Sequence, residues 1–404
     1  MIELLLYCFS MEIIICISEI LFWLSIFMIL YTYLIYPLLL WFISHISKGY
    51  FPASHRFEDL TFVSIIIPAY NEEGVIGQKI ESILSNNFPR GKYEILIGSD
   101  ASTDNTDSII KEYSIKYPFV KLTRYPTRQG KPNIINDLVK RANSEIVILT
   151  DANVFFTKNT IFELSKYFKD KEIGLVDANM VNTGMRKSGI SFQENTYITH
   201  EVKLKNREGL IWGMMMGPFG GCFAISKKCY SQIPMNFLVD DFYLNMKVLE
   251  KGYKAINNLN AVVHENVSHD PREEFRRKVR ISSGNFQNLS YFKSLLFSKI
   301  RGLSFCFISH KVIRWFVPFF ILLAFITNLV IINKHWIYLI GLSLQLAIYI
   351  IPIIDVLLRK IKIDIVILRF VTHFINMNLA LFTGFIKYAK GIKTNVWEPT
   401  TRNQ

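Results

Sequence analysis

Residues 20–42 form an unbroken apolar run without a charged side chain, and this feature restricts the chain more than any other. A helix of this length, at about 1.5 Å per residue, crosses roughly 30 Å of hydrocarbon, so we expect a transmembrane helix. The first lysine or arginine is Lys48, and Glu3, Glu12 and Glu19 precede the run, unlike the basic start of a signal peptide. Because the positive charge follows the run, the next domain is expected to face the cytoplasm.

Charge-free runs return in the last quarter of the chain, at residues 316–332, 336–354 and 370–386. Basic residues precede the first run and follow the second, as in a hairpin that begins and ends in the cytoplasm. The third run contains a histidine and two asparagines and has basic residues on both sides. We expect the first two to span the membrane and the third either to cross it or to lie in its interface.

The apolar runs divide the chain into five parts. We expect an N-terminal transmembrane helix at 1–50, a cytoplasmic domain at 55–285, interfacial helices at 286–312, a C-terminal transmembrane region at 313–390 and a cytoplasmic or interfacial tail at 391–404. Within residues 286–310, aromatic, leucine and basic residues recur at roughly helical spacing, which favours an interfacial helix. A core helix of the soluble domain is the alternative.

The composition excludes several classes of protein. Half of the residues are apolar, which rules out a disordered chain or a collagen. The 46 lysine and arginine residues against 33 aspartate and glutamate residues give a net charge of +13, which indicates an anionic partner such as phosphate or a lipid surface. The five cysteines form no C-x-x-C pair, and we interpret them as reduced and structural.

Residues 61–180 alternate short β-branched segments with helical ones. We expect strands at TFVSIII, YEILIGS, VKLTRY and EIVILT, and helices after the first three, at about 74–87, 104–117 and 131–143. This alternation predicts an α/β domain with a parallel, doubly wound sheet. Ligands of such sheets collect beyond the carboxyl ends of the strands, where the chemistry should therefore be sought.

Polar residues stand where these predicted strands end. Asp100 closes the second strand, and its carboxylate can accept hydrogen bonds from the edge of a base. Lys131 lies in a basic loop before the third helix, where cations and the helix dipole favour phosphate; a solvated basic turn is an equal alternative. Asp151 and Asn153 follow the fourth strand, and their side-chain oxygens are suitable ligands for a hard divalent cation. The same D-A-N triplet recurs at 177–179 inside an apolar run, so we favour the first copy.

Three later segments are also candidates for function. The GPFGGC segment at 217–222 offers backbone that a sugar can approach closely, or it is a plain turn. Asp240 and Asp241 begin a predicted helix, where adjacent carboxylates serve as caps or hold a general base. The RRKVR segment at 276–280 is either a basic belt for acidic headgroups or the source of a guanidinium for a diphosphate.

Taken in order, these segments resemble a membrane-bound family 2 glycosyltransferase of the GT-A fold, of the polysaccharide synthase type. The resemblance covers nearly the whole chain and rests on seven motifs in the family's order, namely SIIIPAYNEE, SDASTDNT, RQGKPN, TDAN, the GG segment, VDDFYLNMKVLEKGY and VWEPTTR. It implies a nucleotide-sugar-binding domain with a mixed, mainly parallel sheet, flanked by transmembrane helices.

The resemblance also implies a role for individual residues. Asp241 would be the base that takes the proton of the acceptor hydroxyl, with Asp240 beside it and Arg280 near the leaving diphosphate. The donor would be bound by Pro68, Tyr70, Glu72, Asp100, Lys131 and Asp151. Mg²⁺ or Mn²⁺ would be held by Asp151 and by Asn153, which stands where the family usually has an acid.

The function implied is inverting transfer of a sugar from a nucleotide donor, expected to be UDP-linked, to a membrane-associated or lipid-linked glycan. Such an enzyme would serve cell-surface or exopolysaccharide synthesis from the inner membrane, with no nucleic acid as partner. A processive polysaccharide synthase is the alternative, but its Q-x-x-R-W signature appears at 277–281 with only Arg280 retained. A catalytically inactive, nucleotide-binding membrane scaffold is a second alternative, and the presence of Asp100, Asp151 and Asp241 argues against it.

Overall fold

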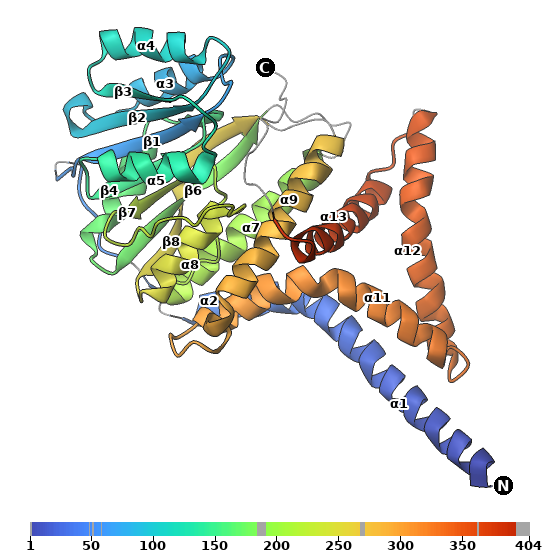
Figure 1. The fold of residues 1–404 in the computed structure, drawn as a ribbon. Coiled ribbons are helices and arrows are strands. Elements are labelled where there is room, and N and C mark those ends of the chain that lie inside the picture. The colour runs from blue at the N-terminus through green and yellow to red at the C-terminus, as the bar shows by residue number, and fades with distance from the viewer. Residues whose placement is uncertain are drawn as a thin grey trace.

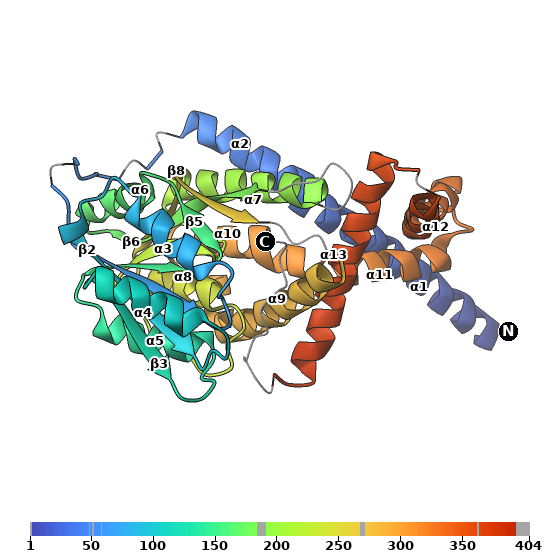
Figure 2. The same ribbon diagram turned by 90° about the horizontal axis from the view of Figure 1, so that it is seen from above.

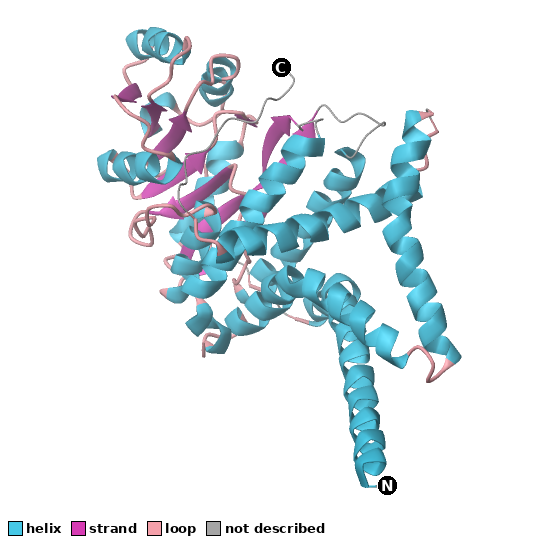
Figure 3. Cartoon of the chain, turned by 45° about the vertical axis from the view of Figure 1, so that its right-hand side comes forward, coloured by secondary structure: helices cyan, strands magenta, loops and turns pink. Residues whose placement is uncertain are grey.

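A computed structural model describes residues 2–47, 49–50, 52–57, 59–183, 191–266, 271–361 and 363–392. The closing VWEPTTR motif lies outside the described residues. The described chain forms an α/β body from which several long helices extend (Figure 1). In Figure 3 the strands all lie in this body, and the long helices leave it on one side.

The body is built on an eight-stranded sheet in the order β3-β2-β1-β4-β7-β6-β8-β5. The strands are β1 (Val63–Ala69), β2 (Tyr93–Asp100), β3 (Val120–Tyr125), β4 (Ile146–Thr150), β5 (Val154–Phe156), β6 (Ile173–Thr183), β7 (Cys222–Ser226) and β8 (Lys254–Asn266). The first four strands are parallel, as predicted. Strand β7 then runs antiparallel between β4 and β6, while β8 is parallel to β6 and antiparallel to β5. The expectation of a mixed, mainly parallel sheet is confirmed.

Helices cover both faces of the sheet, and every residue of β1, β2 and β4 is therefore buried. The helices of the body are α3 (Ile76–Leu84), α4 (Thr106–Lys116), α5 (Lys131–Arg141), α6 (Thr160–Ser165), α7 (Ser191–Trp212), α8 (Asp240–Glu250) and α9 (Pro271–Tyr291). The core on one face includes residues of α3, α4 and α6, and the core on the other includes residues of α5, α8 and α9.

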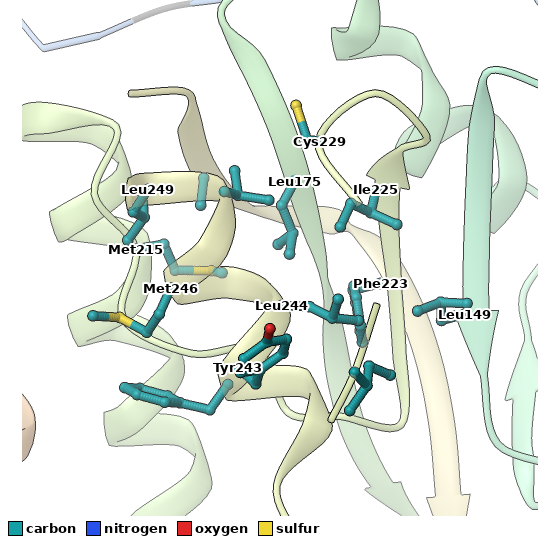
Figure 4. Packing of buried hydrophobic residues seen from close by; sticks show 14 of the residues in the cluster. Leu149, Leu175, Met215, Phe223, Ile225, Cys229, Tyr243, Leu244, Met246 and Leu249 are labelled. Atoms are coloured by element: carbon teal, nitrogen blue, oxygen red, sulfur yellow. The ribbon is translucent and has the colours of Figure 1, made fainter. Parts of the chain in front are cut away.

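Helix α8 is fixed against the sheet by its apolar side. Figure 4 shows Leu244 of α8 beside Phe223 of β7, in the same buried cluster as Leu175 of β6. This packing matters for function because it sets the position of the first turn of α8, which contains Asp240 and Asp241.

Among the described residues, four helical stretches are long and apolar enough to cross a membrane: Met11–Ile46, Leu303–Ile331, Trp336–Lys360 and Val366–Ala389. The first begins within α1 (Ile2–Leu30) and continues through a π-helical segment at Tyr31–Ile35 and α2 (Tyr36–Ile46). The others contain α11 (Ile313–Ile331), α12 (Trp336–Lys360) and α13 (Val366–Ala389). The run at 370–386, which the sequence left open, thus belongs to a helix of membrane-spanning length and composition.

The first apolar stretch is anchored to the body through α7. Figure 2 shows α2 lying along α7, and the hydroxyl of Tyr36 donates to Glu208 of α7 at 2.7 Å. His310, in the π-helical segment Phe307–Val312 before α11, also contacts Glu208, at 2.7 Å. A buried carboxylate on α7 therefore joins two of the apolar stretches to the domain.

The single helix expected over 286–310 is not formed. Helix α9 begins at Pro271 and ends at Tyr291, and the segment from Leu303 leads into α11. The chain turns between them at Gly302, which has φ +84° and whose added Cβ would lie 2.7 Å from the ring of Trp212. Phe292 and Phe307, which we expected in an interfacial helix, are buried in the core of the body. These aromatic side chains thus pack into the hydrophobic core of the body and do not form one face of a continuous helix.

Helix α13 packs closely on α9 at a glycine. An added Cβ on Gly384 would lie 2.8 Å from the carbonyl oxygen of Val279 and would also meet the side chain of Ser282. Ser282 and Ser283 donate to the carbonyl oxygens of Leu381 and Gly384 at 2.8 and 3.0 Å. The absence of a side chain at 384 lets the two backbones approach, and this places α13 beside the carboxyl end of the sheet.

Candidate active site

A cavity of about 840 Å³ opens at the carboxyl ends of β1 and β4 and continues between α7, α9, α11 and α13. We call this the central cavity. Of the residues predicted to act in the site, the following line it: Pro68, Glu72, Lys131, Asp151, Asn153, Asp240, Asp241 and Arg280. Tyr70 and Asp100 are not among the lining residues. The fold therefore brings together residues that are up to 212 positions apart in the sequence.

Lys131 and Asp151 form an ion pair in the central cavity. The ammonium of Lys131, at the start of α5, lies 2.7 Å from the carboxylate of Asp151, which directly follows β4. Burial lowers the pKa of Lys131, but Asp151 and Asp240 outweigh this effect and raise the pKa above its ordinary value. A permanent positive charge thus stands at the N-terminus of a helix, which is a favourable place for a phosphate group.

The charge of Asp241 depends strongly on its surroundings. Burial raises its pKa to about 7, and the neighbouring Asp240 adds to this effect, while Lys131 opposes it. A carboxylate that titrates near neutral pH is suited to accept a proton during a reaction. Asp241 therefore has the properties of a general base.

The loop before β7 lies directly against Asp241. Gly220 has φ +76°, and a Cβ added to it would lie 2.5 Å from the carboxylate oxygen Oδ2 of Asp241. In the same loop Gly217 has φ +78°, and its added Cβ would lie 2.7 Å from the ring of Phe242. Gly217 and Gly220 are thus required by close approach to the first turn of α8, a reason that the sequence alone did not supply.

Asp100 holds the loop that precedes Lys131. Its side chain is buried and accepts hydrogen bonds from the backbone N–H groups of Gln129 and Gly130, at 2.5 and 3.0 Å, and from the guanidinium of Arg128 at 3.2 Å. The guanidinium of Arg128 lies 3.3 Å from the centre of the Tyr70 ring. Asp100 thereby orders the turn into α5, and its predicted contact with the edge of a base stays a prediction.

Glu72 is held in place by the loop that follows β2. Its backbone N–H donates to Thr106 at 2.8 Å, and the side chain of the preceding residue, Asn71, accepts a hydrogen bond from the backbone N–H of Thr103 at 2.9 Å. Asn71 has φ +52°, a left-handed conformation that asparagine tolerates better than most residues. The two loops at the carboxyl ends of β1 and β2 are therefore joined.

Arg280 lies on α9 and lines the central cavity. Burial lowers its pKa below the ordinary value, and the negative charge of Asp240 opposes this effect. Within the described part of the chain Arg280 has no ion-pair partner closer than 4 Å, so its charge is available to an anion in the cavity.

Asn153 donates to a residue that the sequence analysis missed. Its amide lies 3.2 Å from the carboxylate of Glu265, which also lines the central cavity. The antiparallel pairing of β5 with β8 sets Val154 opposite Glu265 and so brings the two side chains together. Glu265 belongs to no recognised motif, and no pattern in the sequence could have shown that β8 would return to this point.

The donor set fits a divalent cation that is held mainly by substrate. Asp151, Asn153 and Glu265 offer only oxygen ligands, which Mg²⁺ and Mn²⁺ prefer. Among the described residues no cluster of three or more His, Cys, Asp and Glu side chains is arranged to hold a metal alone. Mg²⁺ is commonly bound by one or two carboxylates together with substrate phosphates, and this cavity matches that pattern.

The second D-A-N triplet lies inside β6. The side chain of Asp177 is fully buried and accepts a hydrogen bond from the ammonium of Lys205 at 2.6 Å. Burial raises the pKa of Asp177, although Lys205 opposes this effect. The backbone N–H of Phe219 also approaches Asp177, at 3.4 Å, so this carboxylate helps to support the loop that contacts Asp241.

The chain is similar in sequence to known glycosyltransferases. Residues 64–233 match the profile of Glycosyl transferase family 2. The chain is 25% identical over 242 residues to the probable glycosyltransferase YdaM of Bacillus subtilis, covering 56% of each protein. It is 27% identical over 216 residues to a protein of Methanococcus voltae, covering 50% of this chain and 66% of that protein. That relative is named dolichyl N-acetyl-α-D-glucosaminyl phosphate 3-β-D-2,3-diacetamido-2,3-dideoxy-β-D-glucuronosyltransferase. The matches thus span about half to two thirds of the relatives' length.

A solved structure shares the fold. The mannosyltransferase PcManGT of Pyrobaculum calidifontis, solved with GDP-Man and Mn²⁺, superposes with a TM-score of 0.70 at 19% identity, over 91% of this chain and 99% of that one. The α/β body and its helices therefore have a GT-A type of architecture. Residues 64–233 thus match the glycosyltransferase family that the motifs resemble.

Proposed function

We propose that this chain is an inverting glycosyltransferase that moves a sugar from a nucleoside diphosphate to a membrane-associated or lipid-linked glycan. The observation that carries the proposal is the convergence of Lys131, Asp151 and Asp241 on one cavity at the carboxyl ends of the strands. A cation for phosphate and a carboxylate that titrates near neutral pH are the two groups that glycosyl transfer from a diphosphate requires.

The reaction follows from this arrangement as a single displacement. The acceptor hydroxyl oxygen forms a bond to the anomeric carbon while the bond from that carbon to the diphosphate oxygen breaks. Asp241 takes the hydroxyl proton, and the diphosphate leaves with the electron pair. Attack opposite to the leaving group inverts the anomeric configuration. Lys131 and Arg280 would stabilise the charge that develops on the diphosphate.

A divalent cation is part of the proposal. Asp151 and Asn153, with Glu265 beside them, would hold Mg²⁺ or Mn²⁺. When bound, the cation would neutralise charge on the leaving diphosphate. We assign this role to a divalent cation because the three side chains offer only oxygen ligands.

Chelation with EDTA is therefore expected to weaken donor binding, because the diphosphate then loses its cation. The measurement is equilibrium binding of radiolabelled UDP and GDP to the full chain in nanodiscs, before and after EDTA, with Mn²⁺ added back. Asp151→Asn should reduce the gain that Mn²⁺ restores. Donor affinity that is indifferent to EDTA would contradict metal use and leave a donor site based on Lys131 and Arg280.

The direct test of the function is transfer in membranes. Membranes that contain the chain are incubated with a panel of radiolabelled UDP- and GDP-sugars, and the lipid products are extracted and sized. Incorporation of one sugar from one donor supports the proposal, and we expect UDP-linked donors to serve. A ladder of long products would instead favour a processive synthase, and no incorporation from any donor would contradict the enzyme.

Transfer is expected to increase with pH through a midpoint near the Asp241 pKa of about 7, because only the deprotonated carboxylate accepts a proton. Below that midpoint the initial rate should fall roughly tenfold for each pH unit. In Asp240→Asn the midpoint should shift to lower pH, since a neighbouring negative charge is removed. A rate profile measured at low acceptor concentration checks this, and an unshifted midpoint in the variant would exclude Asp241 as the titrating group.

We further propose that the α/β body faces the cytoplasm of a multi-pass inner-membrane protein. The four apolar helical stretches and the basic residues that follow the first of them support this orientation. In this arrangement the donor would reach the central cavity from the cytoplasm and the acceptor from the bilayer.

A further inference from the structure

The central cavity has a second part, away from Lys131 and Asp151. We call it the helix end, and its walls are formed by residues of α7, α9, α11, α13 and the π-helical segment Tyr31–Ile35. Its apolar lining includes Tyr33, Trp315, Phe374, Met377 and Leu381. Three of these belong to α13, which is of membrane-spanning length and composition. A single cavity thus connects the candidate base with helices that would lie in the bilayer.

Several buried polar atoms at the helix end lack a hydrogen-bond partner among the described residues. They are Oε1 of Gln193, Oε2 of Glu194, Nε of Arg314 and Nε2 of His373. All four residues line the central cavity, and Gln193 and Glu194 are only 2% and 4% exposed. Oε2 of Glu194 lies 3.6 Å from Nε2 of His373, too far for a direct hydrogen bond.

Such atoms indicate the chemistry of a ligand. Leaving a buried donor or acceptor unpaired costs about 1–3 kcal/mol, so four of them in one cavity are expected to be paired when the site is in use. Arg314 can only donate through Nε, whereas the carboxylate of Glu194 and the carbonyl oxygen of Gln193 can only accept. A hydroxyl group both donates and accepts, so a hydroxyl-rich molecule can satisfy all of them.

The charges of the helix end argue against an anion. Lys278 lies 2.6 Å from Glu194, Arg277 lies 2.9 Å from Glu274, and Arg314 lies 2.5 Å from Glu201, which also pairs with Lys311. Each of these four described cations therefore has a carboxylate partner, and Lys311 and Arg314 share Glu201. A phosphate placed beside Glu194 would meet its carboxylate, and the described cations nearest to it, Lys278 and Arg277, are already paired with Glu194 and Glu274.

We propose that the helix end is the acceptor site and that it binds the uncharged sugar headgroup of a glycolipid. Gln193, Glu194, Arg314 and His373 hold the sugar hydroxyls, and the lipid chain lies along Phe374, Met377 and Leu381 of α13. The inference rests on the proposed function, since it names the acceptor of the same reaction. The inference also predicts that the site binds a sugar headgroup and does not bind a lipid phosphate.

The test compares amphiphiles that share one alkyl chain: dodecyl glucoside, dodecyl maltoside and dodecyl phosphate, with free maltose as the probe without a chain. Each is measured below its micellar concentration for equilibrium binding to the full chain in nanodiscs, and separately for incorporation of labelled sugar. We expect the glycosides to bind at least tenfold more tightly than dodecyl phosphate or maltose.

Two variants locate the binding. His373→Phe and Gln193→Leu each remove hydrogen bonds to the headgroup, and each should weaken dodecyl maltoside binding by roughly tenfold while UDP and GDP binding stays unchanged. The matched control is Thr372→Val, because Thr372 is next to His373 on α13, is buried and does not line the cavity. That control should bind all probes like the original chain.

The outcomes separate the inference from the proposed function. Dodecyl phosphate binding as tightly as the glycosides, or glycoside binding that neither variant weakens, would overturn the acceptor site. Loss of glycoside binding in both variants supports the acceptor site, even if no sugar is transferred. Absence of sugar transfer would then contradict the proposed function and not the acceptor site.

Discussion

Asp241→Asn is expected to lower the rate of sugar transfer by roughly 10²–10⁴-fold, the usual contribution of a general base, and to leave nucleotide binding nearly unchanged. Asparagine keeps the size of the side chain but cannot take up the acceptor proton. The loss should appear in kcat, because in the proposed mechanism Asp241 would contact the reacting hydroxyl and not the donor nucleotide. Initial rates with the donor found in the panel, together with UDP and GDP binding, provide the measurement.

A matched control for this variant is Asp137→Asn on α5. Asp137 pairs with Arg141 at 2.9 Å and does not line the central cavity. The Asp137→Asn variant should transfer sugar at the rate of the original chain. This result would show that loss of a carboxylate in the body does not by itself reduce activity. Turnover close to normal in Asp241→Asn would remove Asp241 from the mechanism.

Gly220→Ala is expected to reduce transfer by about 100-fold without unfolding the protein. The new Cβ would meet Oδ2 of Asp241 at 2.5 Å, and the carboxylate must move because it is the flexible end of a side chain. A displacement of about 1 Å in a catalytic group can cost about 10²-fold in rate. Rate and thermal unfolding are measured on the same preparation.

Gly252→Ala supplies the control, since it separates backbone strain from contact with Asp241. Gly252 has φ +82°, close to the +76° of Gly220, but its added Cβ would meet nothing within 4 Å. Both substitutions place alanine in a left-handed conformation, at a cost of about 1–2 kcal/mol in stability. Only the variant at 220 should lose activity, and equal losses in both would exclude a specific effect on Asp241.

The local elements were predictable because they depend on local residues. The β-branched runs became β1 to β4, and the helices expected at about 74–87, 104–117 and 131–143 became α3, α4 and α5 with shorter ends. The helix expected from Asp240 begins there, with both carboxylates in its first turn. Side-chain shape and apolar spacing act over a few residues, so their pattern is visible in the sequence.

The helix expected within 286–310 is not continuous, while the position of this segment at a membrane interface stays a prediction. Its aromatic and basic residues have helical spacing, but Phe292 and Phe307 pack into the core, and Gly302 turns the chain against Trp212. A local pattern cannot tell an interface with lipid from an interface with the rest of the protein, because both bury apolar side chains.

The sequence by itself determined the apolar helical stretches, the four parallel strands and the residue types of the candidate site. Only the tertiary structure decided that β8 brings Glu265 to Asn153, that Asp100 orders the loop before Lys131, and that α13 brings His373 beside Glu194. The reason is that strand pairing and helix packing join residues that are distant in the chain, and no spacing along the sequence records which distant surfaces will meet.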